Sequence, residues 1–195
     1  MRTRSVLSAA LAAALLALAG CGANSGTGNE TADTQSSGSS PTGLPPASPG
    51  AGSEETTEPE APRPLRFTAT RVDGKHFDAT TLAGRPTVLW FWAPWCPKCK
   101  AQASATSKVA ADYAGRAHVV GVAGLDRNKA MKDFVADTRT SGFPHLSDEN
   151  GKVWKRFEVT EQSRYVILDK DGKTVYEGVL PAGEGLAEKV SGLVG

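Results

Sequence analysis

The chain has 195 residues, enough for one domain of ordinary size with additional segments, but only 39% are hydrophobic, and 21 are glycine and 12 proline. One globular unit over the whole length is therefore not expected, and a net charge of +1 argues against a nucleic-acid partner. Three cysteines are too few for a disulfide-rich scaffold, and the composition excludes collagen, a coiled coil and a multi-span membrane protein.

Residues 1–20 have the features of a bacterial export signal. Arg2 and Arg4 precede an uncharged run rich in Ala and Leu, residues 6–18, which is too short for a transmembrane helix. The run ends in Leu-Ala-Gly-Cys, which resembles the lipobox of bacterial lipoproteins. The resemblance implies cleavage after residue 20 and a lipid on Cys21 that holds the protein on the outer side of the cell membrane. An ordinary secretory signal with a chance cysteine is the alternative.

Residues 21–64 are predicted to be the lipidated cysteine and a disordered tether. The segment is mainly Gly, Ser, Thr, Pro and Ala, and Leu44 is almost its only large apolar residue. Such a composition cannot bury enough surface to offset the entropy of ordering. Every Trp, Tyr and Phe lies later in the chain, so we place the folded domain in residues 65–195.

Strand and helix patterns alternate within the predicted domain. We expect strands at 67–72 and 75–77 around an Asp-Gly turn, strands at 87–92 and 118–123, and a terminal hairpin of 165–168 and 173–179. Helices are expected at 97–113, 128–138, about 153–157 and 185–194, the first of them burying a stripe of Ala101, Ala105, Val109 and Tyr113. This order predicts an α/β domain with a central mixed β-sheet flanked by helices.

The strongest chemical signal is Phe-Trp-Ala-Pro-Trp-Cys-Pro-Lys-Cys, residues 91–99. Cys96 stands where a buried strand passes into a helix, and the unpaired N–H groups and positive dipole end of a helix start favour a thiolate. Pro97 suits the first helical turn, and Lys98 adds a positive charge. Cys99 lies one turn further on, within reach of a mixed disulfide at Cys96. The pair predicts thiol–disulfide exchange, with no cofactor and no metal.

Other roles for the two cysteines fit the sequence less well. A structural disulfide across so short a loop would constrain the unfolded chain little. A zinc site needs two more ligands, and His76, His118 and His145 show no paired spacing. Two buried, inert cysteines would not need the surrounding aromatic and proline residues.

Residues 91–100 resemble the active site of the thioredoxin superfamily. The leading hairpin and the string Leu-Ala-Gly-Arg-Pro at 82–86 resemble its exported TlpA/ResA/DsbE-like branch. The resemblance runs from about Phe67 to the C-terminus, and it implies a thioredoxin fold with an N-terminal β-hairpin and a central insertion from about 127 to 161. It also implies that Cys96 is the nucleophile and Cys99 the resolving thiol, with Trp95 as the aromatic residue packed beside them.

The chain departs from the family pattern at two positions. Classical thioredoxin has a buried Asp where this chain has Trp90, so another group or water must accept the proton of Cys99. Ser163 takes the place of the cis-proline in the substrate-binding loop, between Gln162 and Arg164. We expect a trans peptide bond at Ser163, because a cis bond to a non-proline residue is costly. We also expect its N–H and hydroxyl to lie near the sulfurs, where they would stabilise the Cys96 thiolate or admit a metal.

Together these features predict a membrane-tethered, extracytoplasmic thiol–disulfide oxidoreductase. It would act as a monomer on cysteines of exported proteins, together with an unidentified redox partner in the membrane or outside the cell. We slightly favour an enzyme that forms disulfides in its substrates over one that reduces them, as enzymes of cytochrome c maturation do. The reason is that Lys98 favours the thiolate of the reduced enzyme, which makes its disulfide more oxidising.

Three alternatives remain. A copper- or other metal-binding chaperone of thioredoxin-like fold would use a histidine such as His145, which we place in a loop. A thiol peroxidase would have a threonine where this chain has Ala93. A binding module without redox activity is the third.

Overall fold

The computed structural model describes residues 60–195; the predicted export signal, Cys21 and nearly all of the predicted tether lie outside this range. The strands are β1 (Thr68–Thr70), β2 (His76–Asp78), β3 (Thr87–Trp92), β4 (His118–Ala123), β5 (His145–Ser147), β6 (Arg164–Leu168) and β7 (Thr174–Val179). The α-helices are α1 (Pro97–Asp112), α2 (Asn128–Asp137), α3 (Lys152–Arg156) and α4 (Leu186–Ser191). Among the described residues, no helix is long and apolar enough to cross a membrane.

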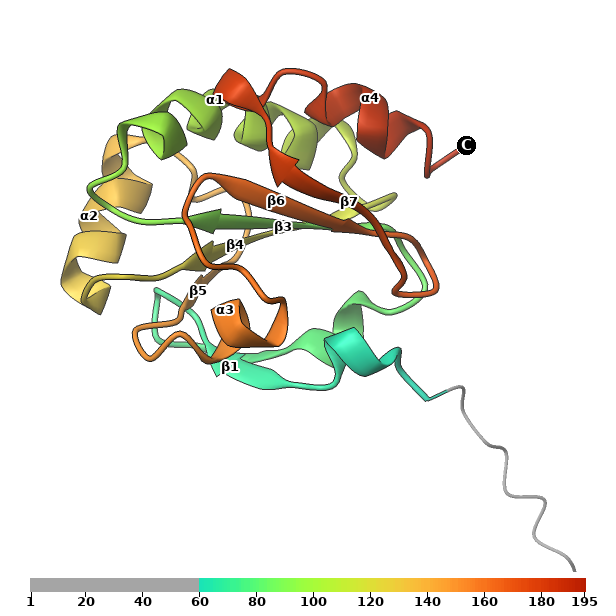
Figure 1. Cartoon of the computed structure of the whole chain (residues 1–195), viewed down its shortest axis with the longest axis horizontal. Coiled ribbons are helices and arrows are strands. Elements are labelled where there is room, and N and C mark those ends of the chain that lie inside the picture. The colour runs from blue at the N-terminus through green and yellow to red at the C-terminus, as the bar shows by residue number, and fades with distance from the viewer. Residues whose placement is uncertain (1–59) are drawn as a thin grey trace, which may run out of the picture. The chain divides into compact units, whose positions relative to one another are not determined.

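Five strands form one mixed sheet in the order β5-β4-β3-β6-β7 (Figure 1). The central strand β3 runs parallel to β4 and antiparallel to β6. A right-handed β–α–β connection through α1 is the standard way to join parallel neighbours such as β3 and β4. The predicted α/β class and central mixed sheet are confirmed.

The side chains of β3 divide the core into two halves, because successive residues of a strand point to opposite faces. Trp90 and Trp92 face a cluster that includes buried residues of α1, α2 and α4. Leu89 and Phe91 face a second cluster, which includes Trp154 of α3. Figure 1 shows α1 and α4 on one side of the sheet and α3 with the β1–β2 hairpin on the other. All six residues of β3 are buried, as expected for a strand covered on both faces.

The N-terminal hairpin is present, with a shorter first strand than predicted and a second strand that lies one residue later. β1 and β2 pair antiparallel as a separate two-stranded sheet. The predicted Asp-Gly turn joins them, with Gly74 at a φ of 86° and its N–H donated to the carbonyl of Arg71 (2.9 Å). Ordered contacts begin before Leu65, because the guanidinium of Arg156 donates to the carbonyls of Arg63 and Pro64.

Two sequence predictions about the core are wrong. His145 does not lie in a loop but begins β5, which pairs parallel with β4 and was not predicted. The predicted stripe of α1 is also displaced: Ala101 is exposed, whereas Gln102 and Thr106 are buried with Val109. Their polar groups are tolerated there because each makes hydrogen bonds across the core.

Candidate active site

The two cysteines of the motif form a disulfide at the first turn of α1, with Cα atoms 5.3 Å apart. Cys96 caps the helix, and its Sγ accepts the backbone N–H of Cys99 (3.0 Å). Pro97 occupies the first helical position, where a missing N–H leaves no bond unmade. Cys96 is only 1% exposed and Cys99 is fully buried. The helix start therefore supplies an N–H donor to the sulfur of Cys96, as the sequence predicts.

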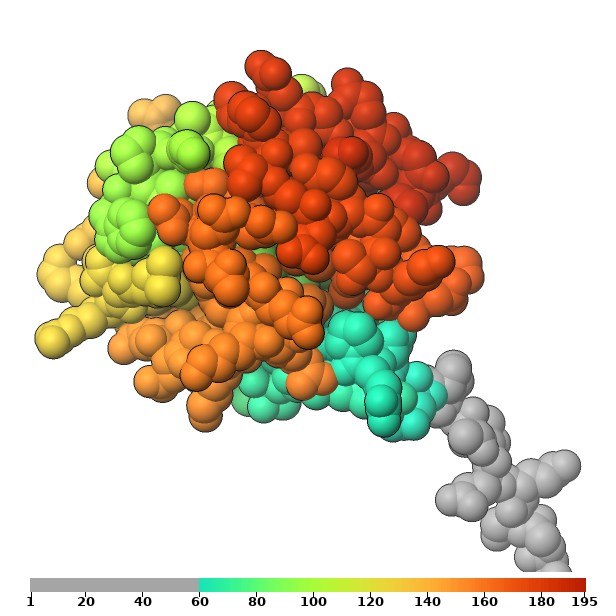
Figure 2. Space-filling view, viewed as in Figure 1, coloured from blue at the N-terminus to red at the C-terminus, as the bar shows by residue number. Residues whose placement is uncertain are grey.

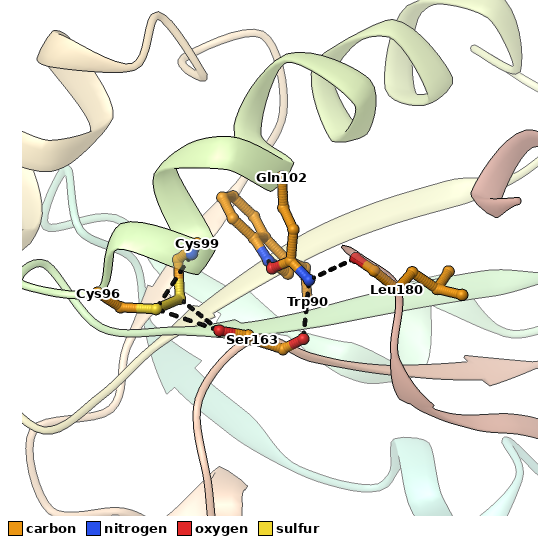
Figure 3. The surroundings of a disulfide bond; sticks show 6 residues. All are labelled: Trp90, Cys96, Cys99, Gln102, Ser163 and Leu180. Carbon is orange, nitrogen blue, oxygen red and sulfur yellow. Dashed lines mark hydrogen bonds between the residues drawn. A yellow bond between two sulfur atoms is a disulfide. The ribbon is translucent and has the colours of Figure 1, made fainter. Parts of the chain in front are cut away.

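Ser163 brings a hydroxyl group to both sulfurs (Figure 3). Its Oγ lies 3.1 Å from Sγ of Cys96 and 3.3 Å from Sγ of Cys99. The backbone of Ser163 is in the left-handed region, with a φ of 70°. Its N–H does not face the sulfurs, contrary to expectation, because it is donated to the carbonyl of Phe91 at the end of β3 (2.9 Å). Only the hydroxyl can thus serve the cysteine pair.

Trp90, at the position where the resemblance implies a buried Asp, pairs with the neutral side chain of Gln102. The indole N–H of Trp90 donates to Oε1 of Gln102 (2.9 Å), and Nε2 of Gln102 donates to the carbonyls of Ser163 and Leu180 (2.9 Å each) (Figure 3). Gln102 belongs to no recognisable sequence motif. Its position three residues after Cys99, one helical turn on, is the only signal that could have indicated it.

The flanking residues of the motif lie at the surface. Trp95 is 55% exposed, and its indole N–H points to the carbonyl of Leu125 (3.4 Å). Leu125 is also exposed and adopts a φ of 60°, an unusual conformation for a leucine. Lys98 is exposed. The exposed residues next to the disulfide are thus the apolar side chains of Trp95 and Leu125 and the positively charged side chain of Lys98.

The predicted substrate-binding loop precedes β6 and meets the start of α1. Figure 2 shows these two segments, in orange and green, adjoining at the surface. Gln162 is half-buried. Arg164 is paired with Glu161 and Glu177 at 2.8 Å each, so its charge is compensated within the domain.

His145 is a core residue and not a ligand. The indole N–H of Trp92 can only donate, so Nδ1 of His145 accepts (3.2 Å), and Nε2–H donates to the carbonyl of Thr140 (2.8 Å). Burial lowers the pKa of His145 to about 4; the bond to Thr140 opposes this effect, and the charge of Arg71 adds to it. Gly121 makes room for the arrangement, since a Cβ there would collide with the imidazole of His145.

Both imidazole nitrogens are therefore occupied, which removes His145 from a copper site with the two cysteines. Among residues 60–195, no group of three or more His, Cys, Asp or Glu side chains is placed to hold a metal ion.

The profile of the AhpC/TSA family matches residues 60–177. The chain belongs to this family. It is 40% identical over 112 residues to the soluble secreted antigen MPT53 of Mycobacterium tuberculosis, a match that covers 57% of this chain and 64% of that protein. The chain thus spans somewhat less than two thirds of the length of this curated relative.

Two solved structures extend the comparison. The structure of MTB dsbF is 40% identical, with a TM-score of 0.63, covering 68% of this chain and 98% of the other. A secreted Mycobacterium tuberculosis disulfide oxidoreductase, homologous to E. coli DsbE, is 36% identical with a TM-score of 0.61, covering 67% and 98%. These relatives confirm the predicted resemblance to exported thiol–disulfide oxidoreductases and the thioredoxin fold.

Proposed function

We propose that this protein is a lipid-anchored, extracytoplasmic thiol–disulfide oxidoreductase that oxidises paired cysteines of exported proteins. The observation that carries the proposal is the Cys96–Cys99 disulfide at the start of α1, with the hydroxyl of Ser163 in reach of both sulfurs. The secreted relatives of the AhpC/TSA family support the location outside the cytoplasm. We further propose that the enzyme acts as a monomer and is reoxidised by a membrane or extracytoplasmic partner.

The exchange proceeds in two steps that balance atoms and electrons. A thiolate of the substrate attacks Sγ of Cys96, the Cys96–Cys99 bond breaks, and Cys99 leaves as a thiolate that takes up a proton. The second thiolate of the substrate then attacks the substrate sulfur of the mixed disulfide, and Cys96 leaves as a thiolate. The substrate dithiol loses two electrons and two protons. The cysteine pair gains both electrons and the proton on Cys99, and the second proton goes to solvent while Cys96 stays a thiolate. The hydroxyl of Ser163 can donate to each departing sulfur in turn.

We propose that the loop around Gln162, Ser163 and Arg164 receives the substrate. Trp95 and Leu125 would offer apolar contact beside the reacting sulfur, since both side chains are exposed. The substrate class is therefore an extended segment of an exported protein that carries a cysteine.

The oxidising direction is supported by the groups around Cys96. The N–H of Cys99, the hydroxyl of Ser163 and the exposed charge of Lys98 would each stabilise a thiolate at Cys96. Trp90 and Gln102 supply no negative charge to oppose them. A stabilised reduced form makes the disulfide a stronger oxidant.

We expect the purified protein, equilibrated with glutathione buffers, to show a reduction potential near or above about −180 mV. Lys98→Gln should make the potential more negative, whereas Lys132→Gln, which removes an exposed charge from α2, should not. A potential near about −270 mV, the thioredoxin region, would overturn the oxidising direction and assign a reductant. The lack of any reversible two-electron couple would overturn the exchange function itself.

The proposed lipid anchor on Cys21 is tested by Cys21→Ala in bacterial cells. The natural chain should be recovered with the membranes and incorporate labelled palmitate. The variant should lose the label and appear in soluble extracytoplasmic fractions, because the lipid is the only anchor we propose. Ser25→Ala serves as the matched control within the same segment. Recovery of the natural chain in the soluble fraction without label would indicate an ordinary secretory signal.

A further inference from the structure

Gln102 is a buried polar residue that the exchange steps do not use. It lies in α1 and is 1% exposed. It makes no hydrogen bond to the sulfur of Cys96 or of Cys99. Its side chain nevertheless makes three hydrogen bonds, each 2.9 Å long, to three separate segments (Figure 3). These are β3 through Trp90, the loop before β6 through Ser163, and the segment directly after β7 through Leu180.

The indole of Trp90 fixes the orientation of the Gln102 amide. An indole N–H can only donate, so the amide oxygen must face Trp90. Both amide hydrogens are then directed at the two carbonyls, of Ser163 and of Leu180. Both hydrogens of the amide are therefore used. A shorter or apolar side chain would leave the indole N–H of Trp90 and the carbonyls of Ser163 and Leu180 without this partner.

The contact with Gln102 completes the attachment of Ser163 to the domain. The N–H of Ser163 is held by the carbonyl of Phe91, and its own carbonyl is held by Gln102. Between these two bonds, Ser163 adopts a φ of 70°, which a serine adopts only when its surroundings enforce it. Releasing the carbonyl would allow the backbone to relax, and the hydroxyl would leave its place between the sulfurs.

We propose that Gln102 is a positioning residue, which sets the reactivity of Cys96 by holding the hydroxyl of Ser163 against the sulfurs of the cysteine pair. The inference rests on the proposed function, since it concerns the same cysteine pair. Gln102 touches neither sulfur by a hydrogen bond and acts through Ser163.

The test measures the rate at which iodoacetamide alkylates Cys96 in the reduced protein across a range of pH. Cys21→Ala is the background, so that Cys21 does not react. Tryptic cleavage after Lys98 places Cys96 and Cys99 on different peptides, which identifies the alkylated residue. We expect Gln102→Leu to move the midpoint of the pH profile upward and to slow alkylation at acidic pH by roughly tenfold, because hydrogen bonds to a charged group are strong.

The matched control is Thr106→Val, one turn further along α1. It removes another buried hydrogen bond between α1 and β6, in which the hydroxyl of Tyr165 donates to Oγ1 of Thr106 (2.7 Å). It also removes the bond from Oγ1 to the backbone carbonyl of Gln102 (2.9 Å), but it leaves the Gln102 side chain and Ser163 untouched. Its profile should match that of the background protein. Gln102→Met, which keeps the length of the side chain, replaces Gln102→Leu if the latter does not fold. An equal shift in Thr106→Val would show that loosened packing is responsible, and would overturn the proposal.

A double-mutant comparison tests the route through Ser163. Ser163→Ala alone should shift the profile as Gln102→Leu does, and the two changes together should add little. A full additional shift from Gln102→Leu in the Ser163→Ala background would overturn the proposal, as would an unshifted profile for Ser163→Ala. Failure of the proposed function is a separate result: the unmutated protein would then lack exchange with protein thiols, whatever these profiles show.

Discussion

Cys96→Ser is expected to reduce disulfide formation in a reduced model protein to the uncatalysed rate, whereas Cys99→Ser should form a trapped mixed disulfide when it meets an oxidised model protein. Without Cys96, the substrate has no sulfur at the helix start to attack. Without Cys99, the protein has no disulfide for a reduced substrate to attack. Its Cys96 thiolate can still attack the disulfide of an oxidised substrate, and no neighbouring thiol is present to resolve the mixed disulfide that forms. Oxidative refolding measures the first effect, and non-reducing electrophoresis with peptide mass analysis measures the second.

Ser104→Ala is the control for this pair of variants, because Ser104 lies exposed on the same helix. It should refold the model protein at the unmutated rate. Mixed disulfides that accumulate on Cys99 in the Cys96→Ser variant, and not on Cys96 in the Cys99→Ser variant, would reverse the two roles.

The free energy of unfolding is expected to fall by about 3 kcal/mol from His145 alone as the pH is lowered from 7 to 4. Burial lowers the pKa of His145 to about 4 in the folded protein, against about 6.5 in an unfolded chain. The unfolded state therefore binds more protons in this window. The stabilisation is complete above about pH 6.5 and is lost as the pH falls towards 4.

The hydrogen bond from Trp92 also disfavours protonation of His145. A proton on Nδ1 would face the indole N–H of Trp92, and two donors cannot share a hydrogen bond. Urea unfolding at a series of pH values measures the effect. His145→Asn removes the titrating group, so its stability should vary less with pH, although its stability at pH 7 should be lower. Burial also lowers the pKa of His118, which is present in both proteins. The effect of His145 is therefore the difference between the stability profiles of the unmutated protein and of His145→Asn. Parallel profiles would contradict the prediction.

The elements with clear sequence patterns were predictable, and the short strand β5 was not. The run Thr87–Trp92 is apolar at nearly every position, and it forms the central strand β3. β5 has only three residues, one of them a histidine, and follows Pro144. So short a segment carries no recognisable alternation, and parallel pairing with β4 is what makes it a strand.

The reactive residues were predictable from their spacing, and their supporting contacts were not. The motif alone indicates Cys96 and Cys99. Gln102 and Thr106 look like surface positions of a helix, because hydrophobic periodicity assigns polar residues to the solvent side. They are buried because Trp90, Ser163 and Tyr165, distant in the chain, provide partners. A buried polar network depends on tertiary contacts, which no local pattern reports.

The near-complete burial of Cys96 affects which molecules can react with the disulfide. Thiol–disulfide exchange requires in-line approach to a sulfur atom, and only 1% of Cys96 is open to solvent. Small thiols that diffuse through the envelope gain little from contact with the surrounding surface. A polypeptide that binds across exposed Trp95 and Leu125 can offset the cost of uncovering the sulfur. The disulfide is in this sense kinetically insulated, and the protein can keep a redox state that differs from that of the small molecules around it.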